Sequence, residues 1–91
     1  MAFIFTRLQV GDFDAWKPMF EADHPGARAD ALGWTLFRST EDRNEVFIQI
    51  EYPTPQAAQA GREKLLASGV LDRFVDKSGP TVVEIVETVR R

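Results

Sequence analysis

The sequence predicts an α+β protein whose elements follow the order β-α-β-β-α-β. Apolar and polar residues alternate, as in half-buried strands, near both ends of the chain and twice in its middle. Two intervening segments carry the signals of a helix start, and Gly and Pro interrupt the chain at the boundaries. Ninety-one residues make one domain, residues 1–91, with no room for a second.

The first strand is expected over Ala2–Val10, because its residues alternate between two faces. One face carries Ile4, Thr6, Leu8 and Val10, and the other carries Phe3, Phe5, Arg7 and Gln9. Gly11-Asp12 ends this strand, and Asp12 is suited to cap a following helix by accepting bonds from its first amides. The first strand therefore leads directly into the first helix.

The stretch Asp12–Arg28 is predicted to contain a helix with an aromatic stripe along one face. Phe13, Trp16, Phe20 and His24 recur at steps of three, four and four, which places them on one face of a helix. Pro18 removes one backbone bond, so a kink or a late start of the helix is expected. Pro25-Gly26 ends the regular part, and a loose turn leads to the next strand.

The middle of the chain predicts an antiparallel hairpin followed by a second helix. Strands are expected over Gly33–Ser39 and Glu45–Tyr52, joined by a polar loop. Pro53 stops the second of these strands, and Thr54 caps a helix that continues to about Ala67. This helix is rich in alanine and can therefore approach a sheet closely.

The C-terminal part predicts a short helical turn and a last strand. The turn lies in the segment VLDRFV and places Val70, Leu71 and Phe74 beneath the main body. After the sequence KSGP, a strand is expected over Thr81–Val89. Four strands and two helices in this order favour a four-stranded antiparallel sheet with both helices on one face, the ferredoxin-like arrangement.

The uncovered face of this sheet is expected to be apolar as well. The third and fourth predicted strands carry apolar residues on both sides, and the first has aromatic residues on one face and aliphatic residues on the other. A polar outer face would be required for a monomer in water. The sequence therefore predicts a homodimer in which two sheets pack across a twofold axis.

Composition excludes several classes of function. The chain has no Cys and one His, which leaves no thiolate nucleophile and argues against a dedicated metal site. The net charge of −3 and the absence of a basic stripe predict no nucleic-acid partner. The N-terminus lacks the long apolar run of a signal or membrane segment, so no membrane partner and a cytoplasmic location are expected.

Two functions found on this topology do not fit the residues. An RNA-recognition motif requires a basic, Gly-containing third strand, whereas EVFIQIEY has two acids and no Gly. An acylphosphatase-like enzyme requires a phosphate-binding loop after the first strand, where this chain has two aspartates in LQVGDFDAW. Both interpretations are rejected.

The segments VGDFDAWKPMFEADHPGARADALGW and EVFIQIEYPTPQAAQA resemble the dimeric α/β-barrel superfamily. The resemblance covers essentially the whole chain and is to its stand-alone antibiotic-biosynthesis-monooxygenase-like and small polyketide-cyclase-like proteins. It implies a barrel closed across a dimer, with a small aromatic or polycyclic substrate between the helices and sheet of each subunit. The strand-one Asn and the helix-two Trp and His of the haem-degrading and quinone-forming branches are missing, so those roles are not transferred.

The expected catalytic residues are His24 and Arg28. Histidine exchanges a proton near neutral pH, so His24 could remove a proton from an acidic C–H or phenol, with Arg28 stabilising the resulting oxyanion. The alternative is that His24 only stabilises the C-terminus of a helix. The expected substrate-binding residues are Trp16, Phe20, Trp34 and Tyr52, for which core packing is the alternative.

Two functional hypotheses follow. The first is a homodimeric small-molecule enzyme, resembling the cofactor-independent monooxygenases and cyclases, that acts on an aromatic or polyketide-like metabolite in an apolar pocket. It would use no cofactor and would act mainly by positioning its substrate. The second is a non-catalytic binding or accessory protein on the same scaffold.

Overall fold

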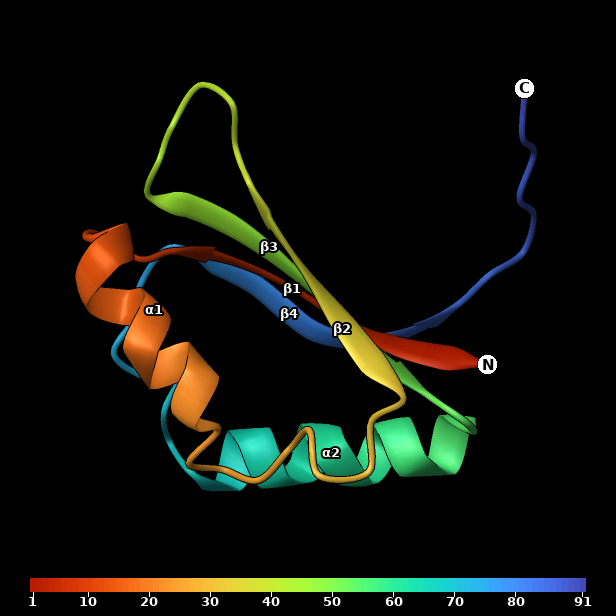
Figure 1. The fold of residues 1–91 in the computed structure, drawn as a ribbon. Coiled ribbons are helices and arrows are strands. Elements are labelled where there is room, and N and C mark those ends of the chain that lie inside the picture. The colour runs from red at the N-terminus through yellow and green to blue at the C-terminus, as the bar shows by residue number, and fades with distance from the viewer.

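The computed structural model describes residues 1–91 and has the predicted element order, with one antiparallel sheet and two helices (Figure 1). The elements are β1 (Ala2–Gln9), α1 (Phe13–Ala22), β2 (Gly33–Arg38), β3 (Glu45–Tyr52), α2 (Pro55–Ala67) and β4 (Lys77–Glu84). The strands are arranged in the order β2-β3-β1-β4, with every neighbouring pair antiparallel. This is the ferredoxin-like topology, and both helices lie on the same side of the sheet (Figure 1).

The core lies between the sheet and the helices. Inward-facing residues of β1 and β3 alternate with residues on the opposite face, and Ile4 of β1 stands directly opposite Ile50 of β3. Eleven buried residues form one cluster: Ala2, Ile4, Leu8, Trp16, Val46, Ile48, Ile50, Tyr52, Ala58, Leu71 and Phe74. The α1 helix contributes Trp16 to this cluster, and Phe13 and Phe20 are partly buried and pack against it.

The first helix begins as predicted and contains its proline without a break. Asp12 caps it, and its Oδ1 accepts bonds from the backbone N–H of Asp14 at 3.1 Å and of Ala15 at 3.3 Å. Pro18 lies inside the continuous helix, so the late start is not observed. The helix ends at Ala22, because Asp23 adopts a left-handed conformation with φ of 46°. His24 therefore leaves the stripe that its spacing predicted.

The second helix matches the prediction at both ends. The Thr54 side chain accepts a bond from the backbone N–H of Ala57 at 3.1 Å, and Pro55 occupies the first turn. The VLDRFV segment forms hydrogen-bonded turns rather than a helix, and it buries Leu71 and Phe74 as expected. Neither helix has the length and hydropathy of a membrane span.

The last strand differs from the prediction. It spans Lys77–Glu84 rather than Thr81–Val89, so it begins and ends earlier in the chain. Pro80 was expected to precede the strand but lies within it, which is possible because β4 is an edge strand and has one side free of partners. A β-bulge between Phe5 and Arg7 accommodates the irregular pairing at this point. Residues 85–91 extend beyond the sheet and away from the helices (Figure 1).

Candidate functional site

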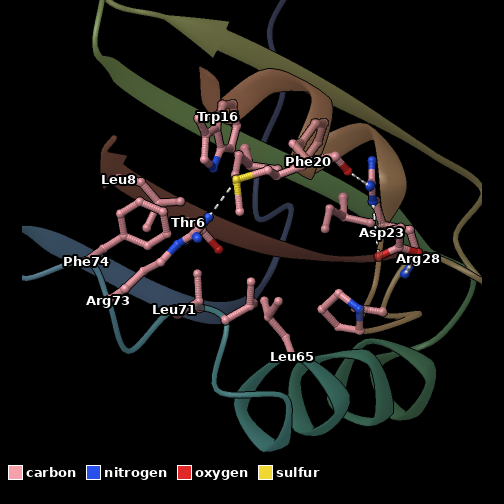
Figure 2. A pocket seen from close by; sticks show the side chains of 16 residues that line it. Thr6, Leu8, Trp16, Phe20, Asp23, Arg28, Leu65, Leu71, Arg73 and Phe74 are labelled. Carbon is pink, nitrogen blue, oxygen red and sulfur yellow. Dashed lines mark hydrogen bonds and ion pairs between the residues drawn. The ribbon is translucent and has the colours of Figure 1, made fainter. Parts of the chain in front are cut away.

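An apolar cavity lies between α1, the sheet and the turns after α2 (Figure 2). Its volume is about 80 Å³. Sixteen residues line it: Thr6, Leu8, Trp16, Met19, Phe20, Asp23, Pro25, Ala27, Arg28, Ile48, Ile50, Leu65, Val70, Leu71, Arg73 and Phe74. Eleven of these are hydrophobic, so the few polar groups would determine how a ligand is oriented.

The aromatic wall of the cavity comes from α1. Trp16 and Phe20 are four residues apart, and their rings stack with centroids 5.1 Å apart and planes inclined by 26°. Phe13 packs against Trp16 from the preceding turn, with a centroid distance of 6.1 Å. The predicted aromatic stripe thus supplies two residues to the cavity, and its first residue supports them from behind.

Arg28 is the most constrained polar residue of the site. Its guanidinium donates a hydrogen bond to the carbonyl oxygen of Phe20 and is paired with Asp23, whose Oδ1 lies 3.5 Å from Nε. The ring of Phe20 lies 4.0 Å from the guanidinium carbon, and the ring of Trp34 lies 4.6 Å from it. Only 7% of Arg28 is exposed. Stacking and pairing together stabilise a cation that burial alone would disfavour.

The left-handed turn at Asp23 explains how Arg28 reaches this position. A non-glycine residue with positive φ is uncommon, but the short polar side chain of Asp tolerates it. The Asp23 carboxylate accepts a bond from the backbone N–H of Arg28 at 3.1 Å, in addition to the pairing with its side chain. Asp23 therefore ends the helix, orders the following turn and fixes Arg28 against the cavity.

The remaining predicted site residues lie outside the cavity lining. Trp34 stacks on Arg28 from the edge strand β2 and is 52% exposed. Tyr52 is fully buried, and its hydroxyl donates to the carbonyl oxygen of Ala27. Burial raises the pKa of Tyr52 to about 12, and the nearby Asp23 carboxylate adds to this effect. His24 is exposed on the surface, although both of its sequence neighbours line the cavity.

Several lining residues were not singled out from the sequence. Thr6 carried a usable signal, because it is a polar residue on the buried face of a strand between Ile4 and Leu8. Its side chain lines the cavity. Met19 and Arg73 come from α1 and from the turns after α2, and no local pattern joins them. Such pairings depend on tertiary packing rather than on spacing in the sequence.

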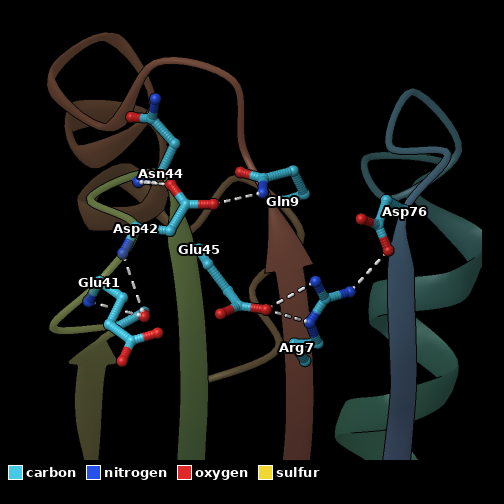
Figure 3. Close-up of polar contacts among 8 residues, drawn as sticks. Arg7, Gln9, Glu41, Asp42, Asn44, Glu45 and Asp76 are labelled. Carbon is cyan, nitrogen blue, oxygen red and sulfur yellow. Dashed lines mark hydrogen bonds and ion pairs between the residues drawn. The ribbon is translucent and has the colours of Figure 1, made fainter.

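A separate polar cluster occupies one end of the opposite sheet face (Figure 3). Arg7 of β1 contacts Glu45 at 2.6 Å and Asp76 at 2.6 Å. Glu45 begins β3 and Asp76 directly precedes β4, so these contacts link β1 to both of its neighbouring strands. Hydrogen bonding to Arg7 lowers the pKa of Asp76, and a hydrogen bond from Gln9 lowers the pKa of Asp42. The cluster is remote from the cavity side of β1, because Arg7 and Thr6 point to opposite faces. Nowhere does the chain bring three acidic or histidine side chains together in a way that could hold a metal ion.

Comparison with known proteins gives structural matches only. No protein-family profile and no curated protein sequence matches the chain. A candidate antibiotic biosynthesis monooxygenase from Nitrosomonas europaea superposes with a TM-score of 0.69 at 17% identity, covering 96% of this chain and 100% of its own. A structure named antibiotic biosynthesis monooxygenase gives 0.66 at 17% identity, with coverages of 98% and 100%.

A candidate antibiotic biosynthesis monooxygenase from Deinococcus radiodurans gives a TM-score of 0.66 at 13% identity. That alignment covers 100% of this chain and 98% of the other. Identities this low establish shared architecture and leave the chemistry to be argued from the site. Over essentially its whole length, the chain has the ferredoxin-like fold of the structures named antibiotic biosynthesis monooxygenases.

Proposed function

We propose that the chain is a small-molecule enzyme of the cofactor-independent monooxygenase or cyclase type. Its substrate is an aromatic or polyketide-like metabolite, held in the cavity between α1 and the sheet. The observation that carries the proposal is the cavity itself, with aromatic walls from Trp16 and Phe20 and few polar groups. The similarity of the fold to structures named antibiotic biosynthesis monooxygenases supports the choice of reaction class.

The chemistry of an activated phenolic substrate makes a cofactor unnecessary for oxygenation. When a methylene carbon is oxidised to a carbonyl by O₂, one oxygen atom enters the product and the other leaves as water with both hydrogens. The substrate therefore supplies all the electrons that O₂ accepts. The protein must hold the ring, assist loss of the first proton and stabilise the anion that remains.

Arg28 is proposed to stabilise that anion from the cavity wall. Its guanidinium is already bonded to Phe20 and Asp23, so its position is fixed before a substrate arrives. His24 is proposed as the proton acceptor at the rim of the cavity, because its neighbours Asp23 and Pro25 line the cavity and the chain has no second histidine. Trp34 and Tyr52 are proposed to act indirectly, by holding Arg28 and the turn at Ala27 in place.

Turnover of an anthrone-type phenol, followed by oxygen uptake and product absorbance, tests this proposal. The wild-type protein should accelerate both above the buffer rate. Arg28→Met should abolish most of the acceleration, and circular dichroism will show whether that variant is still folded. His24→Ala should slow the reaction without changing the fold, since the side chain is exposed. Equal rates for His24→Ala and wild type would remove His24 from the mechanism.

We also propose that the enzyme is a homodimer formed through the outer sheet face. Phe5 and Phe37 are 43% and 46% exposed on this face, and Val83 is 36% exposed. Phe37 lies opposite Phe47, and Phe3 lies opposite Val83, so apolar pairs occur on both halves of this face. Beyond β4, three more apolar residues are exposed: Ile85, Val86 and Val89. A second copy of the chain would cover this face by sheet-on-sheet packing.

Sedimentation velocity across micromolar concentrations tests the dimer. Wild type should sediment as two subunits, and Phe5→Glu or Phe37→Glu should shift it to one. Leu66→Glu is the matched control, because Leu66 is 44% exposed on α2, on the other side of the sheet. A wild-type protein that remains a single subunit at high micromolar concentration would overturn the proposal.

A non-catalytic binding protein on the same scaffold is the second candidate. The position of His24 favours it, because this histidine is exposed and does not line the cavity, where a proton acceptor would be needed. In that case aromatic metabolites should raise the melting temperature without being converted. If a panel of aromatic metabolites raised the melting temperature and none caused oxygen uptake, the binding protein would be the supported candidate.

A further inference from the structure

Two side chains from different parts of the fold form a contact, the Met19–Arg73 cover, where the cavity adjoins a second groove. Arg73, in the turns after α2, places Nη2 at 3.1 Å from the sulfur of Met19 on α1 (Figure 2). Both side chains are exposed, and Met19 is 40% exposed. A contact between a guanidinium and a thioether is weak, because sulfur is a poor hydrogen-bond acceptor. This cover can therefore be displaced at low cost.

A second, shallower groove of about 530 Å³ lies beyond this cover. Four residues line both spaces: Trp16, Met19, Arg73 and Phe74. The inner cavity alone is smaller than the roughly 150 Å³ that holds benzene. An aromatic ligand therefore needs more room than the inner cavity has. Displacing the Met19–Arg73 contact would join the inner cavity and the outer groove into one site.

Arg73 differs from the other arginines near this site in having no carboxylate partner. Arg28 is paired with Asp23 inside the cavity, and Arg7 is paired with Glu45 and Asp76 on the opposite sheet face. Two carboxylates line the groove beside Arg73, but each is engaged elsewhere. Asp12 caps α1, and Asp76 accepts from Arg7 at 2.6 Å. The guanidinium of Arg73 is left for an anionic oxygen brought by a ligand.

The cavity also offers a second polar group along the same path. Thr6 lines the inner cavity, and a hydroxyl group can donate to or accept from a ligand. The other inner walls close to Thr6 are apolar, among them Leu8, Ile48 and Phe74. A planar ring with one oxygen at Thr6 and an anionic group at Arg73 would match this distribution.

We propose that Arg73 is the specificity-determining residue at the cavity entrance, and that it selects aromatic ligands carrying a carboxylate or phenolate. This inference rests on the proposed function, because it assumes that the cavity receives a small aromatic molecule. It goes further by assigning the charge of that molecule and the residue that recognises it. Met19 acts as the apolar half of the same entrance.

Calorimetric titration with 2-naphthoate and with its neutral isostere 2-naphthamide tests the assignment on the intact protein. Wild type should bind the carboxylate about tenfold more tightly than the amide, as expected for one partly exposed charge-assisted bond. Arg73→Met should lose about that tenfold for 2-naphthoate and leave 2-naphthamide binding unchanged. Arg73→Lys, which keeps the charge, should retain part of the preference.

Arg43→Met is the matched control for net charge. Arg43 is exposed, contacts Asp14 at 3.3 Å and is not part of either cavity lining, so its variant should behave as wild type with both probes. Equal weakening by Arg73→Met and Arg43→Met would overturn the assignment, since only long-range charge would then be involved. If wild type bound both probes equally, the cavity would still be an aromatic binding site, but Arg73 would not determine its specificity. Failure of wild type to bind either probe would overturn both this inference and the proposed aromatic site.

Discussion

The hydroxyl group of Tyr52 occupies the space that a side chain at position 61 would need. A Cβ at Gly61 would lie 2.5 Å from the Tyr52 oxygen and 3.0 Å from the carbonyl oxygen of Ala27. Tyr52 donates its hydrogen bond to that same carbonyl. Because Gly61 of α2 has no side chain, Tyr52 of β3 can reach the turn that contains Ala27 and Arg28.

Gly61→Ala should destabilise the protein by about 1–3 kcal/mol, the usual cost of forcing extra volume into a packed interior. The higher helix propensity of alanine recovers less than about 1 kcal/mol of this. Urea unfolding of Gly61→Ala, Tyr52→Phe and the double variant measures the effect. The double variant should be more stable than the sum of the single losses predicts, because Phe removes the crowded oxygen. Strict additivity would show that Tyr52 is not the source of the strain.

The raised pKa of Tyr52 predicts a loss of stability in alkaline solution. The unfolded phenol ionises near its ordinary value of 10.0, whereas burial raises the pKa to about 12 in the folded protein. Between these values the unfolded state binds fewer protons, so the free energy of unfolding falls as pH rises. Unfolding measured from pH 9 to 12 should show this fall in wild type and a smaller one in Tyr52→Phe. Parallel curves for the two proteins would contradict the assignment.

The polar cluster on the outer sheet face predicts a loss of stability in acid. Hydrogen bonds from Arg7 and Gln9 hold the pKa values of Asp76 and Asp42 below the ordinary 3.8. Stability from a carboxylate with a lowered pKa is complete above 3.8 and is lost as pH falls through the folded value. Asp76→Asn should therefore make the unfolding free energy less dependent on pH below about 4. An unchanged acid slope would show that the pair is not maintained in solution.

Arg28→Lys should destabilise the protein although it preserves the charge. Lysine cannot reproduce the planar stacking between Phe20 and Trp34, nor the fork that reaches both the Phe20 carbonyl and Asp23. A loss of about 2 kcal/mol is expected in urea unfolding, less than for a fully buried pair because Asp23 is partly exposed. Lys17→Arg is the control, since its ion pair with Glu21 is exposed on α1. A loss no larger than in that control would show that the guanidinium geometry is unimportant.

The predictions that succeeded rest on local chemistry. Asp12 and Thr54 were identified as caps from residue type and position, and the alternation of β1 and β3 fixed which faces point inward. The end of the first helix was harder to predict, because the left-handed turn at Asp23 uses a residue that also occurs inside helices. That turn moved His24 to the surface and gave Arg28 its place.

The errors concern edges and long-range pairs. The last strand was predicted to begin after Pro80, but an edge strand with a free side can contain a proline. Val86 and Val89 have the composition of a strand, yet within one chain no neighbouring strand extends far enough to pair with them. The Met19–Arg73 contact joins positions more than fifty residues apart, and no periodicity connects them.

The small volume of the cavity has a consequence for kinetics. If an aromatic molecule enters by displacing the Met19–Arg73 contact, as proposed above, encounter and entry are separate events. At low ligand concentration the observed rate of association should rise in proportion to concentration. At high concentration it should level off at the frequency with which the entrance opens, and shortening the Met19 side chain should raise that plateau.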